Sequence, residues 1–417
     1  MKRHAKTRAW SETTFGECVS LVSGGTPSKG NPQFWGGEVP WVSCKDMKRL
    51  RLYDSEDHLT EAALDDGVRL VPAGTVLIVV RGMILAKECP VSVSMRPMAF
   101  NQDLKAIDCR PGVEPQFILY WLLANSHQVL GIADEAAHGT KRLQSDRLLG
   151  LAIRLPPPEL QRRIASILSA YDDLIENNTR RIAILEEMAR LLYREWFVHF
   201  RFPGHQKVRI VESPMGGNPE GWEQVSFSRA AEFVNGYAFK PSDWGTEGDP
   251  IIKIRELKDG VTSQTPRYSG TLAEKYRIRN GDVLFSWSAD LDAYVWASGN
   301  AWLNQHLFLV RPRKGVSEPF IFYALKERMP EFRARSLGTT MRHIKRSALD
   351  QVILLLPPPL LRRRFTDSVA PILDQVLCLG TKNANLRATR DLLLPKLVSG
   401  EIDVSDVKSA LREAARR

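Results

Sequence analysis

The chain has 417 residues, 43% of them hydrophobic, which suffices for roughly two to four domains with buried cores. Its formal net charge of +10 indicates an anionic partner, although net charge does not specify a fold. The five cysteines are odd in number and include no C-x-x-C pair, which argues against a disulfide framework or zinc site and favours a reducing cytoplasm. The basic N-terminus lacks an apolar signal core, and apolar runs such as residues 76–80 are too short to span a membrane, so a cytoplasmic protein is expected.

The first half of the chain alternates turn signals with short apolar runs, which is typical of a mixed α/β domain with many loops. The elements expected in chain order are an apolar helical turn and a glycine-rich bend within residues 12–26, a turn at Gly36-Gly37 before a short strand, a turn at 72–74 before a buried strand, a strand at 99–107, a helix at 115–124 and a strand at 153–155.

An internal repeat then becomes apparent. A triple proline at residues 156–158 returns at residues 357–359, an offset of 201, and a basic cluster and a long stretch of helical spacing follow each triplet. Asn101-Gln102 likewise matches Asn304-Gln305 at an offset of 203. Because the offsets drift by only a few residues, we expect one domain type used twice, with loops that differ between the copies.

Each long stretch shows the 3.5-residue repeat of a coiled coil, because its apolar positions alternate steps of four and three. From residue 159 to 200 an α-helix would be about 60 Å long at about 1.5 Å per residue, so it needs a partner along its seam. The first seam contains Ile164, Leu168, Tyr171, Ile175, Asn178, Ile182, Leu185, Ala189, Leu192 and Trp196. The second contains Phe365, Val369, Ile372, Val376, Leu379, Asn383, Leu386, Arg390, Leu393 and Leu397.

The two seams match if the helices are antiparallel and the residue numbers of facing positions sum to 561. In this register Asn178 faces Asn383, and we hypothesise that the two amides hydrogen-bond and fix the register at some cost in stability. Alternatively, each Asn is half-exposed. Pro371 interrupts the second pattern, so that helix is expected to be kinked there or to start there, and Gly380 weakens it further.

No catalytic motif emerges. Residues 31–34 differ by one residue from the N-P-P-[YF] loop of amino-methyltransferases, but no glycine-rich cofactor loop accompanies them. Asp243 and Glu256 have the residue type of a metal-dependent nuclease, yet their spacing is common by chance. A P-loop, a G-x-S-x-G elbow and a ligand-spaced histidine cluster are all missing, so neither an active site nor a metal is expected.

Basic, hydroxyl and aromatic side chains in the loops are instead candidates for DNA contacts, since such groups bind phosphates and arginine and lysine read guanine edges. For each residue taken alone, a solvated turn or a structural role is the alternative. The candidates are Lys29, Lys45, Arg81, Lys87, Thr140, Lys141 and Arg142 in the first half and Lys240, Lys253, Arg255, Trp287, Thr339, Thr340 and Arg342 in the second.

Over nearly its whole length the chain resembles the DNA-specificity subunits of type I restriction–modification systems. The resemblance lies in residues 23–28 (SGGTPS) and 39–41 (VPW), the two Leu-Pro-Pro-Pro junctions, the two long helices, and residues 390–402 (RDLLLPKLVSGEI).

The resemblance implies an α/β (α+β) fold with target-recognition domains at residues 1–155 and 203–356, and helical regions at 156–202 and 357–417 that form an antiparallel coiled coil. Each domain would read one half of a bipartite site in double-stranded DNA. The helices would set the gap and dock two modification (methyltransferase) subunits through seam positions, and restriction (motor-nuclease) subunits would join. The chain itself would be non-catalytic and without a cofactor, whereas S-adenosylmethionine, ATP and Mg²⁺ would belong to the partner subunits.

Two alternatives remain open. One is a coiled-coil adaptor that does not read DNA, which would leave the two arginine- and aromatic-bearing domains unexplained. The other is a stand-alone DNA methyltransferase or nuclease, which would need the cofactor loop or metal ligands that the sequence lacks.

Overall fold

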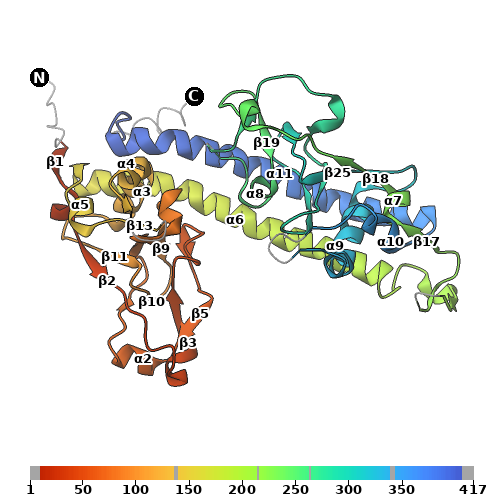
Figure 1. Ribbon diagram of the computed structural model, residues 1–417, viewed down its shortest axis with the longest axis horizontal. Helices are drawn as coiled ribbons and strands as arrows, with labels where there is room; N and C mark the ends of the chain where they lie inside the picture. Colours follow the sequence, from red (N-terminus) through yellow and green to blue (C-terminus); the bar gives the residue numbers. More distant parts are fainter. Residues whose placement is uncertain (1–9, 136–139, 214–215, 263, 339–342, 406–417) are drawn as a thin grey trace, which may run out of the picture. The chain divides into compact units, whose positions relative to one another are not determined.

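The computed structural model describes residues 10–135, 140–213, 216–262, 264–338 and 343–405. The chain forms two compact units. Unit 1 comprises residues 1–172 and 389–417, and unit 2 comprises residues 173–388. Each unit contains one globular domain together with a part of both long helices, whose labels are given in Figure 1. None of the described helices is long and apolar enough to cross a membrane.

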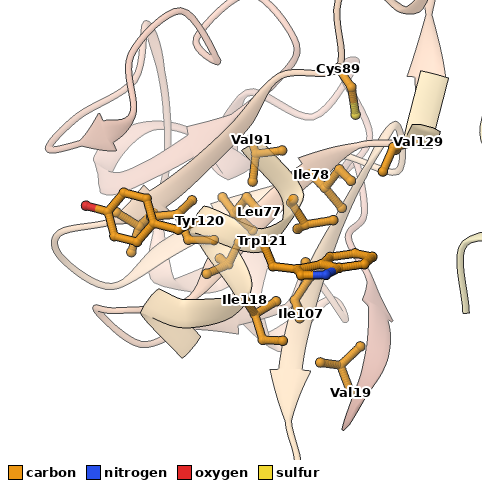
Figure 2. Packing of buried hydrophobic residues seen from close by; sticks show 14 of the residues in the cluster. Val19, Leu77, Ile78, Cys89, Val91, Ile107, Ile118, Tyr120, Trp121 and Val129 are labelled. Carbon is orange, nitrogen blue, oxygen red and sulfur yellow. The ribbon is translucent and has the colours of Figure 1, made fainter. Parts of the chain in front are cut away.

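The core of unit 1 is built on a five-stranded sheet in the order β2-β11-β7-β9-β4. Its strands are β2 (Val19–Ser23), β11 (Leu104–Cys109), β7 (Val76–Val79), β9 (Val91–Ser94) and β4 (Arg51–Leu52). Helix α3 (Pro115–Ala124) packs on this sheet, and Figure 2 shows its Ile118 and Trp121 in one core with Leu77 and Ile107 of the strands. Every residue of β7 is buried, as its unbroken apolar sequence predicts.

A second sheet of unit 1 has the order β5-β3-β10-β6. Its strands are β5 (Asp57–Leu59), β3 (Trp35–Val42), β10 (Met98–Phe100) and β6 (Leu70–Val71). Strands β3 and β10 are parallel, and the other two pairs are antiparallel. Helix α2 (Glu61–Asp65) lies at the end of this sheet that is remote from α6 (Figure 1).

Unit 2 repeats both sheets, except that its first sheet has no described counterpart of β4, and this confirms the predicted duplication. The first has the order β18-β25-β22-β23, with β18 (Ala231–Asn235), β25 (Leu307–Pro312), β22 (Val283–Ser286) and β23 (Asp292–Val295). The second has the order β20-β19-β24-β21, with β20 (Arg267–Tyr268), β19 (Asp249–Ile252), β24 (Ala301–Leu303) and β21 (Arg277–Ile278). The parallel pair recurs at the same place, between β19 and β24.

The first and last strands of each domain pair with one another, and a proline triplet directly follows the last strand in both domains. In unit 1, β1 (Ser11–Thr14) pairs with β14 (Ala152–Leu155), and in unit 2, β17 (Glu223–Ser226) pairs with β26 (Ile353–Leu356). Short helices α1 (Phe15–Cys18) and α7 (Phe227–Ala230) follow the first strands. Phe15 and Phe227, at equivalent positions, are both fully buried.

Several further helices and strands are short, apart from one. They are α4 (Ser126–Gly131) and α5 (Ser145–Leu149) in unit 1, and α8 (Ile254–Asp259), α9 (Glu318–Ala334), α10 (Ala348–Gln351), β15 (Ile210–Val211) and β16 (Asn218–Pro219) in unit 2. The long α9 occupies the place of α3 and carries the matching buried aromatic residues Phe320 and Tyr323.

The two long helices are α6 (Pro158–Phe197) and α11 (Pro359–Ser399). The expectation that the second helix starts at Pro371 is wrong, since α11 begins twelve residues earlier and continues through this proline. Phe365 and Val369, six and two residues before Pro371, are fully buried in the core of unit 2. This packing offsets the backbone hydrogen bond that a proline removes.

The predicted antiparallel register is confirmed within each unit. In unit 1, Ile164 of α6 and Leu397 of α11 lie in one core. In unit 2, the rings of Trp196 and Phe365 are 6.0 Å apart. Asn178 and Asn383 are 9% and 3% exposed and are hydrogen-bonded to each other, so the alternative that they are half-exposed is wrong.

Two local predictions are also wrong. Gly36 and Gly37 do not form a turn, because β3 runs through them with an irregular register against β5. A Cβ at Gly37 would lie 2.3 Å from the carbonyl oxygen of Leu59, which explains why glycine stands there. Residues 99–107 form parts of two strands in different sheets, since buried Asn101 turns the chain by accepting a hydrogen bond from the Asp103 N–H.

Candidate nucleic-acid interface

A small three-stranded sheet brings together three of the predicted DNA contacts in unit 1. Strand β13 (Lys141–Arg142) lies between β8 (Arg81–Gly82) and β12 (Asp134–Glu135), and all pairs are antiparallel. Arg142 is therefore directly opposite Arg81 on one side and Asp134 on the other. These three residues form what we call the first ladder, and directly opposite side chains lie on the same face, about 5 Å apart at Cβ.

The first ladder is anchored to the core and positively charged. The N–H of buried Leu143 donates to the carbonyl of Val80, directly after β7, at 2.8 Å. Asp134 is committed elsewhere, because its Oδ1 lies 2.5 Å from Nη1 of Arg147 and its Oδ2 accepts from Gln144.

Arg81 and Arg142 are both exposed, and their guanidinium groups make no ion pair or hydrogen bond with another described residue. Like charges directly opposite destabilise a sheet, so this arrangement favours an anion nearby.

The same ladder occurs in unit 2 with different side chains. His343 bridges Ser288 on one side and Leu337 on the other, and we call these residues the second ladder. His343 and Leu337 exchange backbone hydrogen bonds of 2.8 and 3.0 Å. The N–H of Ile344 donates to the carbonyl of Trp287 at 3.0 Å, just as Leu143 does in unit 1. Thr339, Thr340 and Arg342 lie outside the described residues.

Lys45 lies in the turn after β3 and Arg255 lies in α8 after β19, and both have acidic partners within their own domains. The ammonium group of Lys45 is 3.1 Å from Glu56 and 2.9 Å from Asp57, and the hydrogen bond to Asp57 raises the pKa of Lys45. The guanidinium group of Arg255 is 3.1 Å from the buried carboxylate of Glu256. These two cations are less available for phosphate than the sequence suggests.

Lys253 lies over an exposed aromatic ring that the sequence analysis missed. Its Nζ is 3.8 Å from the ring centroid of Trp244, which is 46% exposed, and partial burial lowers the pKa of Lys253. By contrast, Trp287 is half-buried, and its indole N–H donates to the carbonyl of Gln305 at 3.1 Å. The sequence signal for Trp244 was a tryptophan within a polar turn, residues 241–249, where no core residue is expected.

The other candidates lie on exposed loops. Lys87 directly follows the short helix η2 (Met83–Ala86), which contacts β13, and Thr140 directly precedes β13, so both belong to the surroundings of the first ladder. Lys29 follows β2, and Lys240 directly precedes the short helix η5 (Pro241–Asp243). The structure thus gathers Arg81, Lys87, Thr140, Lys141 and Arg142 around one small sheet and leaves Lys29 and Lys45 on separate loops of the same unit.

A buried polar network connects the domain of unit 1 with the helices. Tyr120 of α3 donates to Oδ2 of Asp172 at 2.7 Å, and Nη1 of Arg390 lies 2.5 Å from Oδ1 of the same carboxylate. Burial and the Asp172 charge raise the pKa of Tyr120. Burial alone would lower the pKa of Arg390, yet Asp172 raises it above the ordinary value. In the sequence, the indication of this network was Arg390, a charged residue at an otherwise apolar seam position.

The equivalent tyrosine of unit 2 has a different environment. Tyr323 lies among aromatic rings, with that of Tyr193 at 6.2 Å and that of Phe365 at 6.4 Å. Its hydroxyl group is buried and has no hydrogen-bond partner in the part of the chain that the structure describes.

Helix α6 also carries an apolar stripe that faces solvent in unit 2. Ile184, Met188 and Leu191 are 61%, 53% and 48% exposed and are spaced by four and three residues, which places them on one face. We call these three residues the α6 stripe.

Among the described residues, no group of three or more His, Cys, Asp and Glu side chains could hold a metal ion.

The chain is thus a duplicated α/β domain joined to an antiparallel helix pair, with one ladder at the equivalent place in each copy. The family model for the type I restriction modification DNA specificity domain matches residues 8–187 and 219–360. The chain therefore belongs to this family: it is a specificity subunit of a type I restriction–modification system, and its function is DNA target recognition rather than catalysis.

Named relatives agree with this assignment. The MjaIX specificity subunit of Methanocaldococcus jannaschii is 26% identical over 419 residues, covering 95% of this chain and 94% of the relative. The EcoR124I/EcoR124II specificity subunit of Escherichia coli is 32% identical over 198 residues, covering 47% of this chain and 49% of the relative. The crystal structure of an S subunit from M. genitalium has the same fold, with a TM-score of 0.54, 15% identity, and coverage of 97% of this chain and 99% of that one.

Proposed function

We propose that each domain reads one half of a bipartite site in double-stranded DNA. The observation that carries this proposal is the pair of ladders: the backbone pairing is the same, but Arg81, Asp134 and Arg142 in unit 1 are replaced by Ser288, Leu337 and His343 in unit 2. A repeated scaffold with different side chains can bind two similar segments of duplex and distinguish their bases. The two half-sites are therefore expected to differ in sequence.

Lysines on exposed loops supply the sequence-independent part of binding. Lys29, Lys87 and Lys240 project from loops of the two domains, and lysine–phosphate contacts position a protein on DNA without reading its bases. Lys253 over Trp244 presents a cation together with an aromatic face in unit 2.

The helix pair sets the gap between the half-sites and docks two methyltransferase subunits. The α6 stripe supports the docking, since exposed apolar side chains at this spacing suit an apolar groove or helix of a partner. S-adenosylmethionine, ATP and Mg²⁺ then belong to the methyltransferase and restriction subunits, and this chain contributes recognition.

The test of bipartite reading is methylation sequencing of host DNA with this gene present and with it deleted. A split motif, with two short half-sites around a fixed gap, should be methylated only when the gene is present. If no motif depends on the gene, even when the chain and its methyltransferase subunits are co-expressed, bipartite reading is wrong.

Docking is tested separately by co-purification. Met188→Asp should release the methyltransferase subunits, because it places a charge in the α6 stripe. Asn177→Asp, at an exposed position of the same helix, is the matched control and should retain them. Equal retention in both variants would remove the α6 stripe from the docking surface.

A further inference from the structure

The two ladders have the same backbone pairing but different side chains: the first carries two arginines, and the second carries an exposed leucine. This difference suggests which base each ladder contacts. We propose that the ladders are the specificity-determining elements of the two domains: Arg142 reads a guanine in one half-site, and Leu337 reads the methyl group of a thymine in the other. This inference rests on the proposed bipartite function and names the bases that each unit recognises.

The geometry of the first ladder suits a guanine. The major groove admits an antiparallel two-stranded ribbon such as the pair β12 and β13, and guanine presents its N7 and O6 there as adjacent acceptors that one arginine can bind together. Arg142 is on the central strand of the sheet, with exposed Arg81 directly opposite. Asp134, the other neighbour, holds Arg147 and Gln144 and is not available to occupy the Arg142 guanidinium. The position therefore combines a backbone paired on both sides with an uncommitted planar donor group.

The second ladder suits a thymine. Ser288 is buried, with its Oγ 3.2 Å from Nδ1 of His306, and so cannot reach a base edge. Leu337 is 45% exposed and lies directly opposite His343. An exposed apolar side chain on a ribbon in the major groove would contact the C5-methyl group, which only thymine presents there. None of the three residues of the second ladder is a lysine or an arginine.

The first test is selection of bound duplexes from a randomised pool, with the full chain assembled with its methyltransferase subunits. The wild-type protein should select a two-part motif. Arg142→Ala should relax one half-site at a G·C pair, and Leu337→Ala should relax the other at an A·T pair, with preference for the original base falling on the order of tenfold. Arg69→Ala removes an equal charge from an exposed position of unit 1 outside the ladder and should leave the motif unchanged.

A second test leaves the protein unaltered and so does not depend on the folding of a variant. In the selected duplex, 7-deazaguanine at the critical guanine removes the N7 acceptor, and deoxyuridine at the critical thymine removes the methyl group. Each replacement should weaken wild-type binding on the order of tenfold, and each should have no further effect on the matching variant.

Three outcomes would overturn the assignment: both variants relaxing the same half-site, neither relaxing any base, or the analogues binding as well as the natural bases. Failure of the wild-type protein to select a two-part motif is a different result, because it contradicts the proposed bipartite function itself.

Discussion

The side-chain amide of Asn178 donates a hydrogen bond of 3.0 Å to the side-chain oxygen of Asn383, inside the helix pair of unit 2. Asn383 in turn donates to the carbonyl of Ile175 and to the hydroxyl of Thr179, both at 3.2 Å. Sliding one helix by a turn would leave these buried amide groups without partners. These buried hydrogen bonds therefore favour one register of α6 against α11.

Replacing one member of this pair should be worse than replacing both. Asn178→Leu leaves the side-chain oxygen of Asn383 buried without its donor, which should lower the free energy of unfolding by about 1–3 kcal/mol. The double variant Asn178→Leu/Asn383→Leu should regain most of this loss, because no buried amide remains. Chemical denaturation of the single and double variants measures the coupling, with Asn177→Leu, at an exposed neighbour, as the control.

The register of the double variant is the second readout. Cysteines introduced by Leu185→Cys and Val376→Cys, which face each other in the native register, should cross-link completely with the Asn pair present and only partly with two leucines. Complete cross-linking in both backgrounds would show that the Asn pair does not determine the register.

The equivalent tyrosines of the two domains should respond in opposite ways to loss of the hydroxyl group. Tyr120→Phe removes a hydrogen bond to the buried, ion-paired Asp172 and should cost about 1.5–3 kcal/mol of stability. Tyr323→Phe removes a buried hydroxyl without a described partner and should be neutral or stabilise by about 1 kcal/mol. Thermal or chemical unfolding of the full chain distinguishes the two, and similar losses in both variants would contradict the assigned difference.

Gly380 permits a close approach between α11 and the loop at Ala297. A Cβ at position 380 would lie 2.7 Å from the Ala297 Cβ, and Thr381 also donates to the Ala297 carbonyl at 3.4 Å. Gly380→Ala should therefore destabilise unit 2 by about 1–3 kcal/mol through overpacking, despite a helix-propensity gain of about 1 kcal/mol.

A compensating change gives this prediction its control. Gly380→Ala combined with Ala297→Gly removes the clash and should restore the denaturation midpoint. If Gly380→Ala alone raises the midpoint, the close approach is absent and only helix propensity matters.

Much of the architecture follows from periodic and repeated sequence features. The seam residues of α6 and α11 predict how the two helices are aligned, because only one antiparallel alignment matches Asn178 with Asn383 and Trp196 with Phe365. Likewise, the offset near 203 between the domains predicts equivalent sheets, and the matched Asn101 and Asn304 directly follow the equivalent strands β10 and β24. A helix start at Pro371 was wrong because tertiary packing outweighs the local penalty of one missing hydrogen bond.

The candidate site was less accessible to sequence reasoning. Arg81 and Arg142 are 61 residues apart, and only the pairing of β8 with β13 places them opposite each other. The second ladder was not foreseen. Its positions carry Ser288, Leu337 and His343, and none of these residues resembles the arginines and the aspartate of the first ladder. The ion pairs of Lys45 depend on β3 and β5 lying side by side, and no local pattern reveals such a contact.

Lysines with and without acidic partners should contribute differently to the salt dependence of DNA binding. Lys87 is exposed beside the first ladder and its ammonium group has no partner among the described residues, whereas Lys45 is held by Glu56 and Asp57. A lysine that contacts phosphate releases about one counterion on binding, so its loss lowers the salt dependence of affinity by about one unit of slope. Lys87→Ala should show this change for every sequence, with the motif unaltered.

Lys45→Ala is the matched control, since it removes the same charge from the same unit. Because this lysine already has two carboxylate partners, its ammonium group is neutralised before DNA arrives, and its removal should leave the slope of log affinity against log salt concentration nearly unchanged. Fluorescence anisotropy at several salt concentrations, with the methyltransferase subunits present, measures both variants. A larger change for Lys45→Ala than for Lys87→Ala would mean that the ion pairs open on binding and that Lys45, as its sequence position first suggested, contacts the DNA backbone.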